Sequence, residues 1–117
     1  MASGTVQLPN FTWYTILAKT TLSTNDTYAT KSTFASRKIT DYDVLLFEFF
    51  RNQWIVGSAV VPTSDFTGNT GVSVSCRWEN ELIEFDAKYT TDTSFDVKKD
   101  TTSTATIAIK IMGLKAA

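Results

Sequence analysis

Histidine is absent from this chain, and cysteine occurs once, as Cys76. Serine and cysteine hydrolases normally use histidine as the base, so the sequence argues against a nucleophilic hydrolase. A single thiol permits no internal disulfide, and the imidazole and paired thiolate ligands of zinc sites are missing. Cys76 falls in step with inward-facing apolar residues, so we expect it to be a buried, unreactive thiol.

The sequence also lacks an excess of positive charge and a long hydrophobic run. Lysine and arginine together number 11 against 12 acidic residues, which leaves no concentrated cationic face for nucleic acid. The apolar run over residues 44–50 is interrupted by Glu48 and is far shorter than the roughly 20 residues that cross a bilayer. Neither a glycine-rich phosphate loop nor a calcium-binding loop is present. We therefore expect no nucleic-acid partner, no membrane insertion, no metal and no cofactor.

Threonine is abundant, at about one residue in six, and with valine, isoleucine and the aromatic residues it favours extended backbone. Residues 1–10 show no clear period and are expected to form an N-terminal arm or an edge strand. Residues 11–117 are long enough for one hydrophobic core. We expect this segment to form a single all-β domain, an antiparallel, jelly-roll-like β-sandwich of about eight strands.

Residues 44–61 are expected to form a hairpin that turns at Asn52-Gln53 and pairs Arg51 with Trp54. In this register one face carries Phe49 beside Val56, Phe47 beside Ser58 and Leu45 beside Val60. The other face carries Phe50 beside Ile55, Leu46 beside Ala59 and Val44 beside Val61. Both faces are apolar, and a chain of this length can cover only one of them with a second sheet. We therefore expect the second face to contact another subunit, through Val44, Leu46, Phe50, Ile55 and Val61.

Residues 72–89 are expected to form a second hairpin that turns at Asn80-Glu81, with Trp78 opposite Ile83 and Cys76 opposite Phe85. In this register the apolar and polar residues separate onto opposite faces, with Leu82 as the exception. The preceding loop, residues 63–71, contains one large apolar residue, Phe66, which is expected to anchor it to the core. The last strand is expected over residues 104–114, with Ile107, Ile109 and Ile111 on one side.

The tryptophans and tyrosines raise the question of sugar binding, because aromatic rings stack on the C–H faces of pyranoses. Trp13 and Trp78 alternate with apolar residues and are expected in the core. Trp54 stands at a hairpin turn, where a ring, amides and a guanidinium could meet a ligand, although a purely structural role is equally open. Tyr28 and Tyr42 are expected near the surface. The candidate ligand-binding residues are Trp54, Arg51, Asn52, Gln53 and Tyr42.

Carboxylate pairs offer the remaining route to catalysis, as in glycoside cleavage. Glu84 and Asp86 lie two residues apart and would share one face of a strand, with Arg77 opposite Glu84 in the expected register. Solvated surface charges are the simpler interpretation of this group. We expect a protein without enzymatic activity, and a glycan-cleaving enzyme is the least favoured alternative.

Two segments resemble a known family. Residues 39–49 (ITDYDVLLFEF), followed by Ser58, Pro62 and Phe66, resemble a segment of phage tail proteins in which isoleucine and tyrosine lead into an apolar strand. Residues 107–115 (IAIKIMGLK) are similar to the closing strand of the same proteins, with Met112 where the family tends to have tyrosine. Together they resemble the C-terminal tip or head domains of tail-fibre, receptor-binding and minor structural proteins of tailed bacteriophages.

The resemblance implies a homotrimer packed along a threefold axis, with exposed loops that bind a host cell-surface saccharide or protein. We therefore expect a virion protein, made in the host cytoplasm, that serves in structure or host recognition and gains avidity from several weak sites. A monomeric carbohydrate-binding module is the main alternative. A capsid decoration or head-fibre protein, which would contact other virion proteins, is a further one. The sequence leaves open whether the chain is an excised domain or a small stand-alone protein.

Overall fold

The structure, a computed structural model, describes residues 11–68 and 70–116, so the expected N-terminal arm over residues 1–10 lies outside it. The described chain contains eight strands, one short α-helix and two 3₁₀ turns. The strands are β1 (Phe11–Thr21), β2 (Ala29–Ser32), β3 (Val44–Arg51), β4 (Trp54–Pro62), β5 (Val72–Trp78), β6 (Glu81–Thr91), β7 (Ser94–Thr101) and β8 (Ile107–Ala116). The helical segments are η1 (Phe34–Ser36), η2 (Ile39–Asp41) and α1 (Thr63–Thr67).

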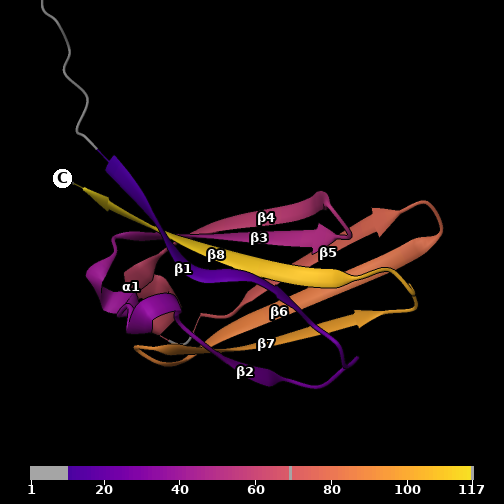
Figure 1. Cartoon of the computed structure of the whole chain (residues 1–117), viewed down its shortest axis with the longest axis horizontal. Coiled ribbons are helices and arrows are strands. Elements are labelled where there is room, and N and C mark those ends of the chain that lie inside the picture. The colour runs from indigo at the N-terminus through magenta and orange to yellow at the C-terminus, as the bar shows by residue number, and fades with distance from the viewer. Residues whose placement is uncertain (1–10, 69, 117) are drawn as a thin grey trace, which may run out of the picture.

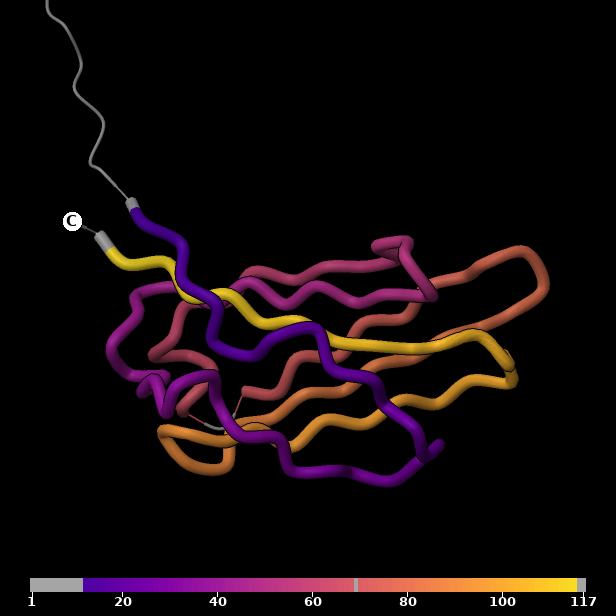
Figure 2. The backbone as a smooth tube through the Cα atoms, in the orientation of Figure 1, coloured from indigo at the N-terminus to yellow at the C-terminus, as the bar shows by residue number. Residues whose placement is uncertain are grey.

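The strands form two antiparallel sheets, ordered β1-β8-β3-β4 and β2-β7-β6-β5, which pack face to face (Figure 1). The chain crosses between the sheets after β1, β2, β4 and β7, and the other connections are hairpins within a sheet. The expected all-β sandwich of about eight strands is confirmed. The paired ends of β1 and β8 lie at the same end of the sandwich as α1, whereas the β3–β4 and β5–β6 turns lie at the opposite end (Figure 2). We refer to the latter as the turn end.

The core is built from aromatic and branched side chains that alternate along the strands. Phe49 and Phe85 stack across the two sheets with 4.4 Å between ring centroids. Phe66, held by α1, is fully buried and lies 5.2 Å from Phe47, so its expected role as the anchor of this loop is confirmed. The expected inward faces of the late strands are also confirmed, with the following residues at most 1% exposed: Phe95, Val97, Ile107, Ile109 and Ile111.

The β3–β4 hairpin turns at Asn52-Gln53 and pairs Arg51 with Trp54, as expected, but its register changes further on. Phe50 pairs with Ile55 and Phe49 with Gly57, which leaves Val56 as an extra residue in β4. Such a bulge exchanges the two faces of the strand beyond it. Leu46 therefore faces Val60 rather than Ala59. Val61 packs against the core, so its expected place on the outer, subunit-contacting face is wrong.

The β5–β6 hairpin turns at Glu79-Asn80, so Trp78 pairs with Glu81 and Cys76 with Ile83, and the expected register is wrong by two residues. A two-residue shift keeps every side chain on its face, because the side-chain period of a strand is two. Ile83 is accordingly fully buried on the apolar face, and Leu82 is 46% exposed on the polar face, as the sequence pattern predicted.

Three aromatic residues differ from expectation. Trp13 is 46% exposed rather than buried, because it stands on the outer face of its sheet, opposite Leu114. Tyr42 is buried rather than superficial, because its ring packs close against Gly113 of β8. Trp78 is half-buried at the rim of the core.

Candidate functional site

The first candidate site is the outer face of the sheet β1-β8-β3-β4, which the second sheet does not cover. Strand pairing arranges its side chains in cross-strand rows. From the chain-end side to the turn end, these rows are Trp13, Leu114, Val44 and Pro62; then Thr15, Met112, Leu46 and Val60; then Lys110, Glu48 and Ser58; and last Ala108, Phe50 and Ile55. We call this surface the outer face.

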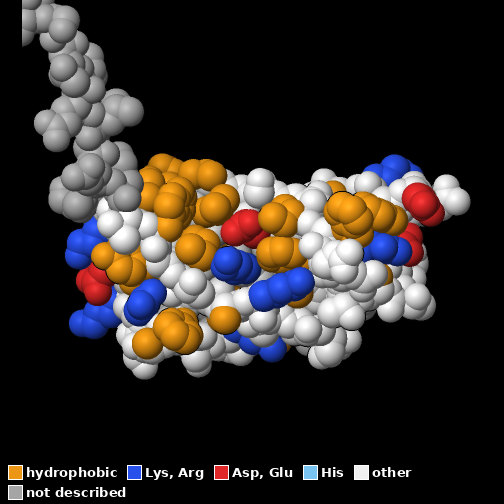
Figure 3. Space-filling view, turned by 45° about the horizontal axis from the view of Figure 1, so that its top comes forward, with side chains coloured by type: hydrophobic (Ala, Val, Ile, Leu, Met, Phe, Trp, Pro, Cys, Tyr) orange, Lys and Arg blue, Asp and Glu red, His pale blue; other side chains and the backbone are white. Residues whose placement is uncertain are grey.

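Apolar side chains on the outer face remain open to water. Val60 is 66% exposed and Ile55 57%, and Val44 and Leu46 are half-buried. Figure 3 shows one cluster of hydrophobic side chains near the chain ends and another near the turn end, with charged side chains between them. Phe50 is only 9% exposed, because the ammonium of Lys19 lies 4.4 Å from its ring centroid. Of the expected contact residues, Val44, Leu46 and Ile55 are therefore available for a partner.

A pair of opposite charges lies in the middle of the outer face. Glu48 of β3 stands directly opposite Lys110 of β8. Among the residues that the structure describes, neither takes part in an ion pair. Both charges are therefore free to pair with groups outside the described chain.

The second candidate site lies at the turn end, where the last residue pairs of two hairpins meet. Arg51 and Trp54 close the β3–β4 hairpin, and Trp78 and Glu81 close the β5–β6 hairpin of the other sheet. The β5–β6 hairpin extends beyond the β3–β4 turn at this end of the sandwich (Figures 1 and 2). We call the group of Arg51, Trp54, Trp78 and Glu81 the ledge. Stacking of the sheets, rather than closeness in sequence, brings the four together.

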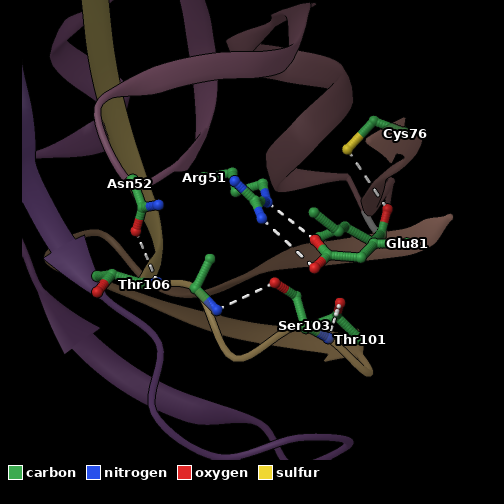
Figure 4. Close-up of polar contacts among 9 residues, drawn as sticks. Arg51, Asn52, Cys76, Glu81, Thr101, Ser103 and Thr106 are labelled. Carbon is green, nitrogen blue, oxygen red and sulfur yellow. Dashed lines mark hydrogen bonds and ion pairs between the residues drawn. The ribbon is translucent and has the colours of Figure 1, made fainter. Parts of the chain in front are cut away.

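The four side chains of the ledge are connected in a series of contacts. The Arg51 guanidinium donates from Nε to Glu81 Oε2 at 2.8 Å and from Nη2 to Oε1 at 3.4 Å (Figure 4). It also lies 5.0 Å from the Trp78 ring centroid, and the Trp78 ring is 6.0 Å from that of Trp54, tilted by 36°. Trp54, at the outer end of the series, is 54% exposed.

The electrostatics of the ledge follow from the Arg51–Glu81 contact. The hydrogen bond from Arg51 holds the pKa of the Glu81 carboxyl below its ordinary value, with a smaller contribution from Ser103. The same hydrogen bond raises the pKa of Arg51. Both groups are therefore charged at neutral pH, and each largely neutralises the other.

Asn52 of the β3–β4 turn has a structural role. Its side-chain Oδ1 accepts a hydrogen bond from the Thr106 N–H at 3.0 Å, and its own N–H donates to the Thr106 carbonyl at 2.7 Å (Figure 4). Its carbonyl accepts from Lys19 at 2.9 Å. These contacts fix the turn, and Gln53 beside it is exposed.

Tyr42 is separated from the other ligand-binding candidates by the length of the sandwich. It lies at the end that carries α1, where it lines an open pocket of about 360 Å³ together with Thr40, Asp43, Thr63, Ser64 and Thr67. Burial raises the pKa of its hydroxyl. The grouping of Tyr42 with Trp54, Arg51, Asn52 and Gln53 is therefore wrong. Trp78 and Glu81, which the sequence did not single out as ligand residues, lie beside Trp54 and Arg51 instead.

The groups considered for catalysis lie apart from both sites. Asp86 pairs with Lys98 at 3.6 Å, and Glu84 is exposed on the polar face of β6, opposite Ser75 rather than Arg77. In the described part of the chain, no group of three or more histidine, cysteine, aspartate or glutamate side chains is placed to hold a metal ion. Cys76 is half-buried, and burial raises the pKa of its thiol.

No helix in the described ranges is long and apolar enough to span a membrane. Comparison with known proteins finds no family model, no curated protein and no solved structure that matches the chain. The functional interpretation therefore depends on the outer face, on the ledge at the turn end and on the sequence patterns themselves.

Proposed function

We propose that this protein is a non-enzymatic structural or host-recognition component of a phage particle, and that it self-associates, as a trimer, through the outer face. The observation that carries the proposal is the contrast between the two sheets. The second sheet turns only polar groups and Leu82 outward from β5 and β6: Ser73, Ser75, Arg77, Glu84, Asp86 and Lys88. The outer face instead presents rows of apolar side chains, and exposed patches of this kind commonly mark interfaces.

Burial of the outer face supplies a driving force for association. Complete burial of a valine or isoleucine side chain contributes roughly 1.5–3 kcal/mol. Val60 and Ile55 keep more than half of their surface in water, so each can contribute about 1 kcal/mol in a contact. The half-buried Val44, Leu46, Met112 and Leu114 add to this total on every copy.

The charges of the outer face favour a second copy of this chain as the occupant. Glu48 and Lys110 stand directly opposite each other on neighbouring strands, and within the described residues neither forms an ion pair. In a ring of three copies, Glu48 of each copy can face Lys110 of the next, and the apolar rows then meet on either side. A contact between unlike parts of the same surface forms a ring when the rotation between copies closes, as it does in a trimer.

The phage assignment is supported by the way in which the two resembling segments meet in space. β3 pairs with β8 from Val44–Leu114 to Arg51–Ile107, and the Tyr42 ring lies against Gly113. The segments 39–49 and 107–115 thus form one packed unit, although they are far apart in the sequence. Their contact is consistent with a shared structural module.

Because a threefold axis repeats the same orientation in each copy, the proposed trimer would display its three turn ends together, away from the described chain ends (Figure 1). Weak sites held at fixed spacing bind a multivalent surface more tightly than any one site alone. The capsid decoration and head-fibre alternatives use the same outer face, whereas the monomeric carbohydrate-binding module would use only the ledge around Trp54.

Light scattering at micromolar concentration tests self-association. We expect a particle of three times the 13.0 kDa chain mass. Val60→Lys, which places a charge on the outer face, should weaken association at least about tenfold, the equivalent of 1.4 kcal/mol. Leu82→Lys is the matched control, because Leu82 is an exposed apolar residue on the other sheet and its replacement should leave the mass unchanged. A wild-type protein that stays at 13.0 kDa at all concentrations would refute the proposed interface.

A further inference from the structure

We propose that the ledge at the turn end binds a neutral pyranose sugar, whose C–H face stacks on the open face of Trp54. This inference rests on the proposed host-recognition function, since it names the ligand class that the displayed turn ends would recognise. The proposed ligand is a sugar and not a protein partner. The outcome for the sugar site can be separated from the outcome for self-association, because a monosaccharide binds one copy at a time.

The Trp54 ring is held from one side and open on the other. Trp78 lies behind it at 6.0 Å, the Arg51 guanidinium lies 5.0 Å from Trp78, and Glu81 fixes Arg51 with two hydrogen bonds. Despite this support, Trp54 leaves 54% of its surface in water. A ring already fixed in position loses little conformational entropy when a ligand stacks on it. The ledge is therefore a prepared platform about the size of one sugar ring.

The surroundings of the platform are polar, as a sugar requires. Gln53 and Asn80 are exposed in the two adjoining turns and offer amide donors and acceptors. Protein partners of ordinary affinity bury about 800 Å² on each side, with an apolar centre. Even with Ile55 exposed on the adjacent outer face, Trp54 offers far less apolar surface than such a centre, which favours a saccharide.

Charge around the platform favours a neutral sugar over an acidic one. Arg51 is the cation of the ledge, and Glu81 already pairs with it. Glu79, in the same turn, adds a second carboxylate whose field acts on Arg51. Lys19, whose ammonium donates to the Asn52 carbonyl in the adjoining turn, balances this second carboxylate, so the surroundings carry no excess positive charge to attract the carboxylate of a uronic or sialic acid.

The test is saturation-transfer NMR on the full chain with methyl glycosides of glucose, galactose, mannose and N-acetylglucosamine, and with glucuronic and sialic acid as acidic probes. We expect at least one neutral glycoside to bind at millimolar concentration, and Trp54→Ala to weaken this binding about tenfold or more. Trp13→Ala is the matched control, because Trp13 is similarly exposed but lies opposite Leu114, at the chain-end side of the outer face, and sugar binding should persist. Circular dichroism verifies that both variants are folded.

A readout on the wild-type protein makes the test independent of the folding of any variant. The ligand should shift the indole N–H resonance of Trp54 and leave that of Trp13 in place. Absence of binding by every neutral glycoside, retention of binding in a folded Trp54→Ala, or a shift confined to Trp13 would each overturn the proposal. Stronger binding of the acidic probes would overturn its charge argument.

Discussion

Gly113 provides the most stringent test of the packing that links the two resembling segments. A Cβ atom at this position would lie 2.5 Å from Cγ and 2.7 Å from Cδ1 of Tyr42, and 2.6 Å from Cδ1 of Ile16. Tyr42 is 8% exposed and Ile16 is fully buried, so neither can move aside into solvent. Gly113→Ala therefore forces the Tyr42 ring or strand β8 to shift.

The expected loss of stability can be estimated from two opposing effects. Overpacking of a core costs roughly 1–3 kcal/mol, and the upper half applies here because Cγ of Tyr42 is the fixed base of a ring. Gly113 has no positive φ, so alanine suits the backbone and restricts the unfolded chain, which returns about 0.4–1 kcal/mol. The net loss is about 2 kcal/mol, or roughly 8 °C in Tm for a domain of this size.

Thermal and urea unfolding followed by circular dichroism measure this loss. Gly71→Ala is the matched control, since its Cβ would meet the Ala87 carbonyl oxygen at an ordinary 3.5 Å and stability should stay level or rise slightly. Tyr42→Ala removes two of the three close contacts made at Gly113. The double variant Tyr42→Ala/Gly113→Ala should therefore lose less stability than the sum of the two single variants.

Equal stability of Gly113→Ala and Gly71→Ala would refute the packing of Tyr42 on β8. Additive losses in the double variant would have the same consequence. Either result would also remove one of the two contacts that join residues 39–49 to residues 107–115, and leave only the pairing of β3 with β8.

Two further predictions concern titratable groups. Since Arg51 lowers the pKa of Glu81, the stabilising effect of this carboxylate is present above its ordinary value of 4.5 and is lost as the pH falls through the lowered pKa. The difference in free energy of unfolding between wild type and Glu81→Gln, measured in urea, should therefore shrink below pH 4.5, and a pH-independent difference would contradict the ion pair. Because burial raises the pKa of Cys76, iodoacetamide should modify the native thiol more slowly than the thiol of the urea-unfolded chain. Equal rates would show that Cys76 is not shielded.

The sequence predicted the inner faces of the strands better than the pairing between them. Ile107, Ile109 and Ile111 lie inward as expected, because alternation is a property of one strand. The bulge at Val56 and the Glu79-Asn80 turn escaped prediction, since neither an extra residue nor a turn placed one position earlier can be seen in the alternation of a single strand.

In the candidate sites too, contacts within one hairpin could be predicted from the sequence, whereas contacts between the two sheets could not. Arg51 and Trp54 could be grouped from the sequence, because one hairpin turn holds them together. Their contacts with Trp78 and Glu81 could not, because these residues belong to the other sheet. Tyr42 was misplaced for a related reason, since its burial depends on the space left by Gly113 in a strand about seventy residues away in the chain.

Composition and alternation by themselves determined an all-β chain, a two-layer core and the direction in which most strand residues point. These are local quantities, set by backbone preference and by the two-residue period of a strand. Only the tertiary structure decided which apolar face stays uncovered and which aromatic rings meet at the turn end, because both depend on how the two sheets are aligned when they stack.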